Sequence, residues 1–382
     1  TIAPMCWQSE ASRACAALST LGARRRVEIT LKDFALDYLR PLLPDGAQLS
    51  ATLQATASAE FGAEGLRDLH AELSTGPGRW QLRGLAPVAL APAQLSINDD
   101  PQGTRIDAKL PITKGEIALN ARLAPGAVFT TRALSGTLRA DLPELSWLPQ
   151  FSLEVADADG RISGALQLAG TLAAPSAQGR LTLSGGRIRL ITPGIELREV
   201  GVRLDAAGSA PLRVAGEARS DGGQIRIVGS VNPWHTPLAL DLKLDGEDFQ
   251  ALKISDARAW VSPNLQIRLA DDLLRVSGTV VVPRASITPK SLGDNSVPVS
   301  GDEVLVGKDP GAQRPRDLHT EADILLSLGD AVRFEGFGLK SRLKGTVQAF
   351  ENPGLPTRAR GEIKLLDGQY KAYGQDLKIE TG

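Results

Sequence analysis

Apolar and polar residues alternate with a period of two through much of the chain, and this period leaves little room for any element other than a β-strand. In residues 238–244 every even position is leucine, and the odd positions carry Ala, Asp and Lys. The same alternation recurs at 187–190, 224–227, 266–269 and 323–328. Each run predicts a strand with one apolar face and one solvated face. We therefore expect an all-β fold.

Turn residues punctuate these runs, since 39 Gly and 24 Pro are spread along the sequence. They predict turns at four places: 159–160, 184–186, 270–272 and 367–368. Helical signals are few. A short helix is expected within 34–43, and one or two turns within 142–148, with Asp141 as the N-cap. Loops are expected at 289–302 and 307–316.

A hairpin unit recurs in the sequence, which favours growth along one axis. The passage 168–188 matches 343–370: each has a Gly-Thr pair and a Pro-containing link, followed by two glycines seven residues apart. Gly179 and Gly186 are spaced like Gly361 and Gly368. At roughly 12–15 residues per strand and turn, the chain supplies about 25–30 strands. Such a sheet would be on the order of 120–140 Å long.

Charge and composition exclude several classes of function. Lys and Arg total 43 and Asp and Glu total 44, so the basic excess that nucleic-acid binding needs is missing. No run of 18 apolar residues is present to span a bilayer as a helix. The start at Thr1 lacks the layout of a signal peptide. We expect a piece of a longer protein whose membrane anchor lies outside this chain.

Cys6 and Cys15 are the two cysteines of the chain. Their proximity favours a local disulfide and an oxidising compartment. Two free thiols in a reducing compartment are the alternative.

No catalytic or metal-binding motif stands out. His70, His235 and His319 are isolated in sequence, which favours structural or surface roles. The pairs Asp99-Asp100 and Asp271-Asp272 flank turns, where Asp bonds its own backbone. The triplet Arg24-Arg25-Arg26 is a solvated run or a contact for anionic lipid. We expect no enzyme activity, cofactor or metal.

The alternating aliphatic residues have two interpretations, an ordinary sandwich core and the wall of an open groove. Only 4% of residues are aromatic, and large sandwich cores usually contain more. We expect a groove for lipid acyl chains, lined by Leu181, Leu183, Ile188, Leu190, Ile225, Ile227, Leu240, Leu242, Leu244, Ile267, Leu269, Val280, Val282, Ile324, Leu326, Leu343, Val347, Ile363, Leu365, Leu377 and Ile379.

Residues 361–382 resemble the TamB family, the inner-membrane-anchored subunit of the translocation and assembly module. The pattern is Gly368-x-Tyr370-x-Ala372-Tyr373-Gly374-x-x-Leu377. Further matching passages are 141–148, 262–265, 276–287 and 300–304, and Cys6 and Cys15 resemble a paired-cysteine element of the family.

The resemblance implies a long curled sheet with an apolar interior, the β-taco of AsmA-like and bridge-like lipid-transfer proteins. It implies a place in the periplasm of a diderm bacterium and transfer of phospholipid between the inner and outer membranes. The alternative is a scaffold for the assembly of outer-membrane proteins and autotransporters with a TamA-like barrel partner. A carbohydrate-active enzyme is disfavoured, because no cluster of acidic and aromatic residues appears.

The resemblance also divides the chain. Residues 1–46 form an upstream periplasmic segment with the disulfide, 47–134 form β-groove repeats, and 135–382 form the TamB-type C-terminal region. This region stops before the family's usual end, so we expect docking to the barrel partner to involve residues outside this chain.

Overall fold

The computed structural model describes residues 2–22, 24–43, 46–62, 65–126, 128–234, 237–290, 319–372, 375–379 and 382. Packing divides the chain into two units. Unit 1 comprises Thr1–Thr192 and Glu196–Gly216, and unit 2 comprises Pro193–Ile195 and Glu217–Gly382. The divisions expected at residues 46 and 134 come from the family resemblance and not from packing, so they stay predictions.

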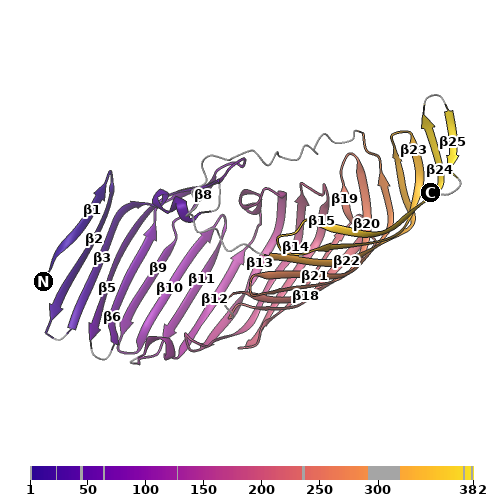
Figure 1. Ribbon diagram of the computed structural model, residues 1–382. Coiled ribbons are helices and arrows are strands. Elements are labelled where there is room, and N and C mark those ends of the chain that lie inside the picture. The colour runs from indigo at the N-terminus through magenta and orange to yellow at the C-terminus, as the bar shows by residue number, and fades with distance from the viewer. Residues whose placement is uncertain are drawn as a thin grey trace. The chain divides into compact units, whose positions relative to one another are not determined.

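Unit 1 is built on one large antiparallel sheet, whose strands follow one another as successive hairpins (Figure 1). Its strands are β1 (Ile2–Ser9), β2 (Ser12–Leu21), β3 (Arg24–Ala35), β5 (Thr52–Gly62), β6 (Gly65–Thr75), β9 (Gln94–Asp100), β10 (Gly103–Ile112), β11 (Gly115–Leu123), β12 (Leu134–Leu142), β13 (Val155–Gly170), β14 (Pro175–Leu190) and β15 (Glu196–Gly208). Short antiparallel connections are what the alternating, turn-rich sequence dictates.

A small second sheet in unit 1 interrupts this sequence of hairpins. It consists of β4 (Ala47–Ser50), β7 (Gly78–Leu82) and β8 (Val88–Leu90). In Figure 1, β8 lies beside one end of the large sheet's strands. Three 3-10 helices complete the unit: η1 (Leu36–Leu42), η2 (Phe129–Thr131) and η3 (Leu148–Phe151).

Unit 2 is a second set of long strands. They are β17 (Gly223–Asn232), β18 (Ala239–Glu247), β19 (Phe249–Lys253), β20 (Ala257–Ala270), β21 (Leu273–Ile287), β22 (His319–Gly336), β23 (Leu339–Glu351), β24 (Arg358–Ala372) and β25 (Gln375–Ile379). β18 and β19 both pair with β20, and β21 pairs with β22 in parallel. β16 (Leu212–Ser220) contains the division between the units.

The expected all-β class is confirmed. Within the described part of each unit, no pairing joins the first strand of the large sheet to the last, so the sheets are open. None of the helices in the described residues is long and apolar enough to cross a membrane.

Three of the four predicted turns are wrong, because the residues lie inside long strands as β-bulges. Residues 159–160 lie within β13, 184–186 within β14 and 367–368 within β24, each at a shift of register. Glycine and aspartate tolerate positive φ angles, which occur in some bulges as well as in turns, and Gly160, Gly185 and Asp367 have them here. Only 270–272 joins two strands, with φ of 51° at Asp271 and 62° at Asp272.

One helix prediction is confirmed and the other is wrong. η1 lies within 34–43, although it is a 3-10 helix. No helix covers 142–147, because β12 ends at Leu142, which pairs with Ile162, and residues 143–147 form a bend and a turn. Asp141 also forms an ion pair with Arg161 rather than capping a helix. The 3-10 helix of this region begins at Leu148. The predicted loops at 289–302 and 307–316 fall almost wholly outside the described residues.

Cys6 and Cys15 lie directly opposite each other on β1 and β2 and form a disulfide, with Cα atoms 4.1 Å apart. We expect a Cys6→Ser, Cys15→Ser double variant to lose about 2–3 kcal/mol of stability in this hairpin, because the unfolded loop is no longer closed. Amide hydrogen exchange in residues 2–21 would measure the loss. The strands of unit 2 serve as the internal control. Equal protection of the hairpin with and without the disulfide would contradict the expectation.

Candidate functional site

The apolar face of unit 1 is continuous from the first strand of its large sheet to the last. Side chains of directly paired residues lie on the same face, so a chain of pairs defines a row across the sheet. One such row, which we call the central row, runs from β1 to β15 through Trp7, Ala14, Leu31, Ala55, Leu73, Leu95, Ala108, Leu119, Leu138, Leu166, Gly179 and Ala206.

A second row lies two residues away on the same face, and it too contains no polar side chain. It runs through Met5, Ala16, Ile29, Ala57, Ala71, Ile97, Ile106, Ala121, Gly136, Leu168, Ala177 and Gly208. Most leucines of the central row, such as Leu119 and Leu138, are only half-buried, whereas Leu166 is buried. A two-layer sandwich would bury such residues fully. The half-burial therefore favours the groove interpretation over the sandwich core.

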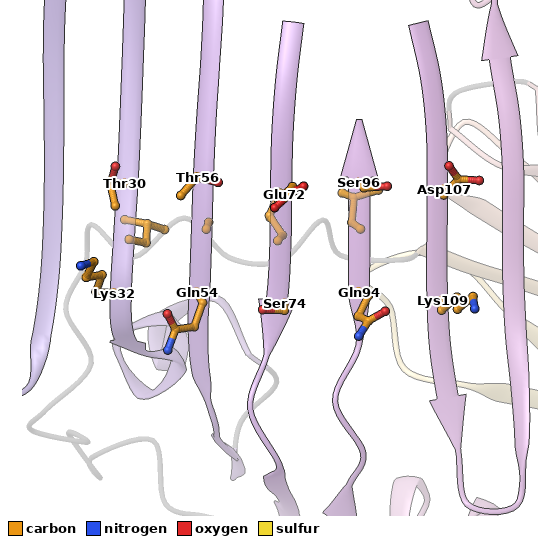
Figure 2. Close-up of a pocket in the computed structure, with 14 residues that line it drawn as sticks. Thr30, Lys32, Gln54, Thr56, Glu72, Ser74, Gln94, Ser96, Asp107 and Lys109 are labelled. Atoms are coloured by element: carbon orange, nitrogen blue, oxygen red, sulfur yellow. The ribbon is translucent and has the colours of Figure 1, made fainter. Parts of the chain in front are cut away.

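The opposite face of the same strands is polar. Figure 2 shows two rows of polar side chains crossing β3, β5, β6, β9 and β10. One consists of Thr30, Thr56, Glu72, Ser96 and Asp107, and the other of Lys32, Gln54, Ser74, Gln94 and Lys109. The first row continues on β11, where the Asn120 amide donates a 2.7 Å hydrogen bond to Asp107. The sheet thus separates an apolar face from a hydrogen-bonded polar face.

Two ion pairs on the polar side of unit 1 lower the pKa of their carboxyl groups. Asp205 accepts a hydrogen bond from Arg180, which lowers the pKa of its carboxyl below the usual value. The Arg122 guanidinium lowers the pKa of Asp100 in the same way, at 2.9 Å. Both carboxylates therefore remain ionised at neutral pH, which fixes this face toward water.

Unit 2 repeats the arrangement of apolar rows. One row, called the Gly278 row, passes through Ile227, Leu244, Leu265, Gly278, Ile324, Ala349 and Ala359. On the same face lie Gly229, Leu242, Ile267 and Val276 in one row, and Val280, Leu326, Val347 and Gly361 in another. These rows bring together eight of the residues predicted from sequence to line a groove, namely Ile227, Leu242, Leu244, Ile267, Val280, Ile324, Leu326 and Val347.

The β-bulges keep the predicted residues on one face of the sheet, although the residue numbers can be odd before a bulge and even after it. In β14 the apolar residues are odd before the bulge, at Leu181 and Leu183, and even after it, at Ile188 and Leu190. Leu183 pairs with Ile162 and Ile188 with Ala158, so both remain beside apolar partners. Without the extra residues the second half of the strand would point its leucines and isoleucines at solvent.

The predicted residues do not share one environment. Val282 is 7% exposed and packs with Val332, Leu326 and Leu343 in a small filled cluster. At the other extreme Ile363 is 48% and Leu377 is 54% exposed. Ile225, Leu240, Leu269, Leu365 and Ile379 are half-buried. The apolar face of unit 2 is therefore packed around Val282 and more exposed on β24 and β25.

Sequence reasoning missed most of the N-terminal lining. The leucines of the central row, such as Leu73, Leu95 and Leu119, were not among the predicted residues, although residues 116–123 alternate as regularly as 238–244. Alanine and glycine occupy many positions of these rows and weaken the apparent alternation. The period-two test, applied with Ala and Gly counted as apolar, would have found them.

The described residues contain no group of His, Cys, Asp and Glu able to hold a metal. His70 contacts Asn98 and Asp68 on the polar face, and His319 is exposed at the start of β22. Asp100 accepts the amide hydrogen of Gln102, as a turn residue does. Arg24 pairs with Glu60 at 3.7 Å and is solvated. His235, Tyr373 and Gly374 lie outside the described residues.

Two family models match the chain. The TamB C-terminal domain matches residues 215–382, and the TamB N-terminal domain matches residues 1–183. The translocation and assembly module subunit TamB of Haemophilus influenzae is 25% identical over 308 residues, which is 76% of this chain and 23% of that protein. The chain thus spans about a quarter of the length of this curated relative. No solved structure matches it.

Proposed function

The chain belongs to the TamB family, and from this premise we propose that its apolar rows carry the acyl chains of phospholipids between the inner and outer membranes of a diderm envelope. The observation that carries the proposal is the unbroken central row of unit 1, with its counterpart in unit 2. The Cys6–Cys15 disulfide supports a periplasmic location, because such bonds persist in oxidising compartments.

The cost of moving a lipid through water explains why such a face is useful. A two-chain lipid exposes about 32 methylenes at ~0.8 kcal/mol each, a barrier near 25 kcal/mol. That barrier corresponds to roughly one escape in several days. Apolar rows remove most of it, because the chains pass from one apolar medium to another.

The chemistry of the rows also favours sliding over tight binding. Leu, Ile, Val and Ala offer only dispersion contacts, each about 0.1–0.2 kcal/mol per atom pair. No directional bond must break when a chain advances to the next strand. At ~4.8 Å between strands, the central row of unit 1 offers a path of about 50 Å. A polar head group would stay in water along the open face.

A photo-crosslinking experiment on the full chain tests the proposal. A benzophenone amino acid is placed at Leu119, on the central row, or at the neighbouring Asn120, on the polar face. After expression in a diderm host and irradiation, mass spectrometry should find phospholipid adducts at Leu119 and none above background at Asn120. Equal labelling of the two positions, or none at Leu119, would refute the acyl-chain proposal.

The same experiment examines a second function, a scaffold for outer-membrane protein assembly with a barrel partner. The name of the Haemophilus influenzae relative, a translocation and assembly module subunit, suggests this function. An open sheet offers unpaired strand edges to an incoming chain. Polypeptide rather than lipid adducts at Leu119 would favour it.

A further inference from the structure

One end of the apolar face in unit 1 leads into a partly enclosed cavity, which we call the side chamber. It has a volume of about 420 Å³. Its walls come from the small sheet at Leu49, Val88 and Leu90, from the end of β10 at Ile112, and from η3 at Phe151. None of the side chains that line it is charged. The rest of the apolar face is walled by a single sheet, so the side chamber differs in having a second wall.

Aromatic residues close one side of the chamber without offering it a polar group. The Trp147 indole N–H donates to the Glu144 carbonyl at 3.1 Å, and that of Trp80 donates to the Gln150 carbonyl at 3.3 Å. The Trp80 ring stacks on Phe151 at 5.4 Å, and the edge of Trp147 meets Phe151 at 5.9 Å. Trp147 and Phe151 line the chamber, and Trp80 supports Phe151 from behind. Since the Trp147 indole hydrogen is already bonded to backbone, these two rings present only apolar surface to the chamber.

The side chamber opens onto the central row. A neighbouring hollow on the apolar face is lined by Leu73, Leu95 and Leu119 of that row. Both this hollow and the chamber include Thr75, Ala93 and Leu110 in their walls. A flexible apolar ligand that lies on the row can therefore enter the chamber without crossing water.

We infer that the side chamber holds the end of a single acyl chain whose remainder lies on the central row; this inference rests on the proposed function and names a binding position within it. A methylene group has about the volume of a liquid water molecule, about 30 Å³, so the chamber accommodates on the order of a dozen methylenes. Water is a poor occupant, because a buried water needs two or more polar partners. A lipid held there would pause on the row with one chain anchored.

Labelling with palmitic acid that carries a diazirine on its terminal carbon tests the inference on the full chain. After irradiation, peptide mass spectrometry should find adducts on the peptide that contains Val88 and Leu90, and also on central-row peptides such as that of Leu119. Leu90→Trp fills the chamber and should reduce the chamber adducts about tenfold, with central-row adducts unchanged. Ala207→Trp, on the exposed polar face of β15, is the matched control and should change neither.

The outcomes test the side chamber and the proposed function separately. Adducts on the central row without chamber adducts overturn the chamber and leave the proposed function standing. Adducts at neither place overturn both. Leu90→Trp could also lose the chamber adducts by unfolding the small sheet. Leu90→Ala, which enlarges the cavity, is the control for this and should keep the chamber adducts. Loss of adducts in both Leu90 variants, or their persistence in Leu90→Trp, would show that the chamber does not hold the chain.

Discussion

Leu242→Asp should reduce the phospholipid bound to unit 2 by about a hundredfold, the largest functional effect we expect. Leu242 lies between Gly229 on β17 and Ile267 on β20, in the middle of the apolar face. An ionised carboxylate there must either lose water to an acyl chain or keep its water and exclude the chain. A penalty near 3 kcal/mol is typical for an unpaired polar group in an apolar site, and it corresponds to about a hundredfold in affinity.

Val228→Asp is the matched control for this variant. Val228 is an aliphatic residue on the neighbouring strand, but it pairs with Lys243 on the polar face and is 47% exposed. The same carboxylate placed there should leave bound lipid unchanged. The measurement is the molar ratio of phospholipid to purified chain by mass spectrometry, with thermal unfolding to confirm that both variants fold. A folded Leu242→Asp protein that retains its lipid would count against an acyl-chain path through unit 2.

The faces of individual strands could be predicted from sequence, because each alternation is local. Leu240, Leu242 and Leu244 lie together on one face of β18, as the period of two requires. Ile267 and Leu269 lie beside them on β20. The side chain of each residue in a strand alternates whatever the neighbouring strand does, so this level of structure needs no knowledge of the partner.

The difference between a turn and a bulge could not be predicted, because the same residues serve both. Ser184-Gly185-Gly186 and Ala270-Asp271-Asp272 look alike as turn signals, but the first is a bulge within β14 and the second joins β20 to β21. Whether such a signal forms a turn or a bulge depends on whether the residues after it stay paired with the same neighbouring strand. Ile188 continues along β13, opposite Ala158, and this pairing depends on residues about thirty positions away in sequence.

The rows and the side chamber depend on register, which a single sequence does not determine. Leu31 and Leu166 share the central row only because each strand between them is paired in one alignment. A slip of one residue at any strand would interrupt the row with polar side chains. The chamber further requires residues from η1, the small sheet and η3 to meet at the end of β10, and no local pattern signals that meeting.

Glycines recur on the apolar rows, and one of them carries the largest stability effect we expect. Gly278 sits in the middle of β21 between Leu265 and Ile324, with a φ of 137°. A Cβ atom there would lie 2.2 Å from the carbonyl oxygen of Asn264, a backbone atom of the paired strand. Gly278→Val should therefore destabilise unit 2 by about 3 kcal/mol, since both the backbone conformation and the contact are unfavourable. Thermal unfolding should show a decrease in Tm of roughly 6–12 °C.

Ser277→Val tests whether position rather than size causes this loss. Ser277 is the adjacent residue, exposed on the polar face opposite Gln266 and Asp323. Valine suits a strand at that position, so its stability should stay within about 0.5 kcal/mol of the parent chain. Equal stability of the two variants would mean that β21 can relax away from Asn264, and that glycine is not needed for the close pairing. If Gly278→Val folds at low temperature, its side chain would also project onto the Gly278 row, so bound lipid should decrease there although no charge has been added.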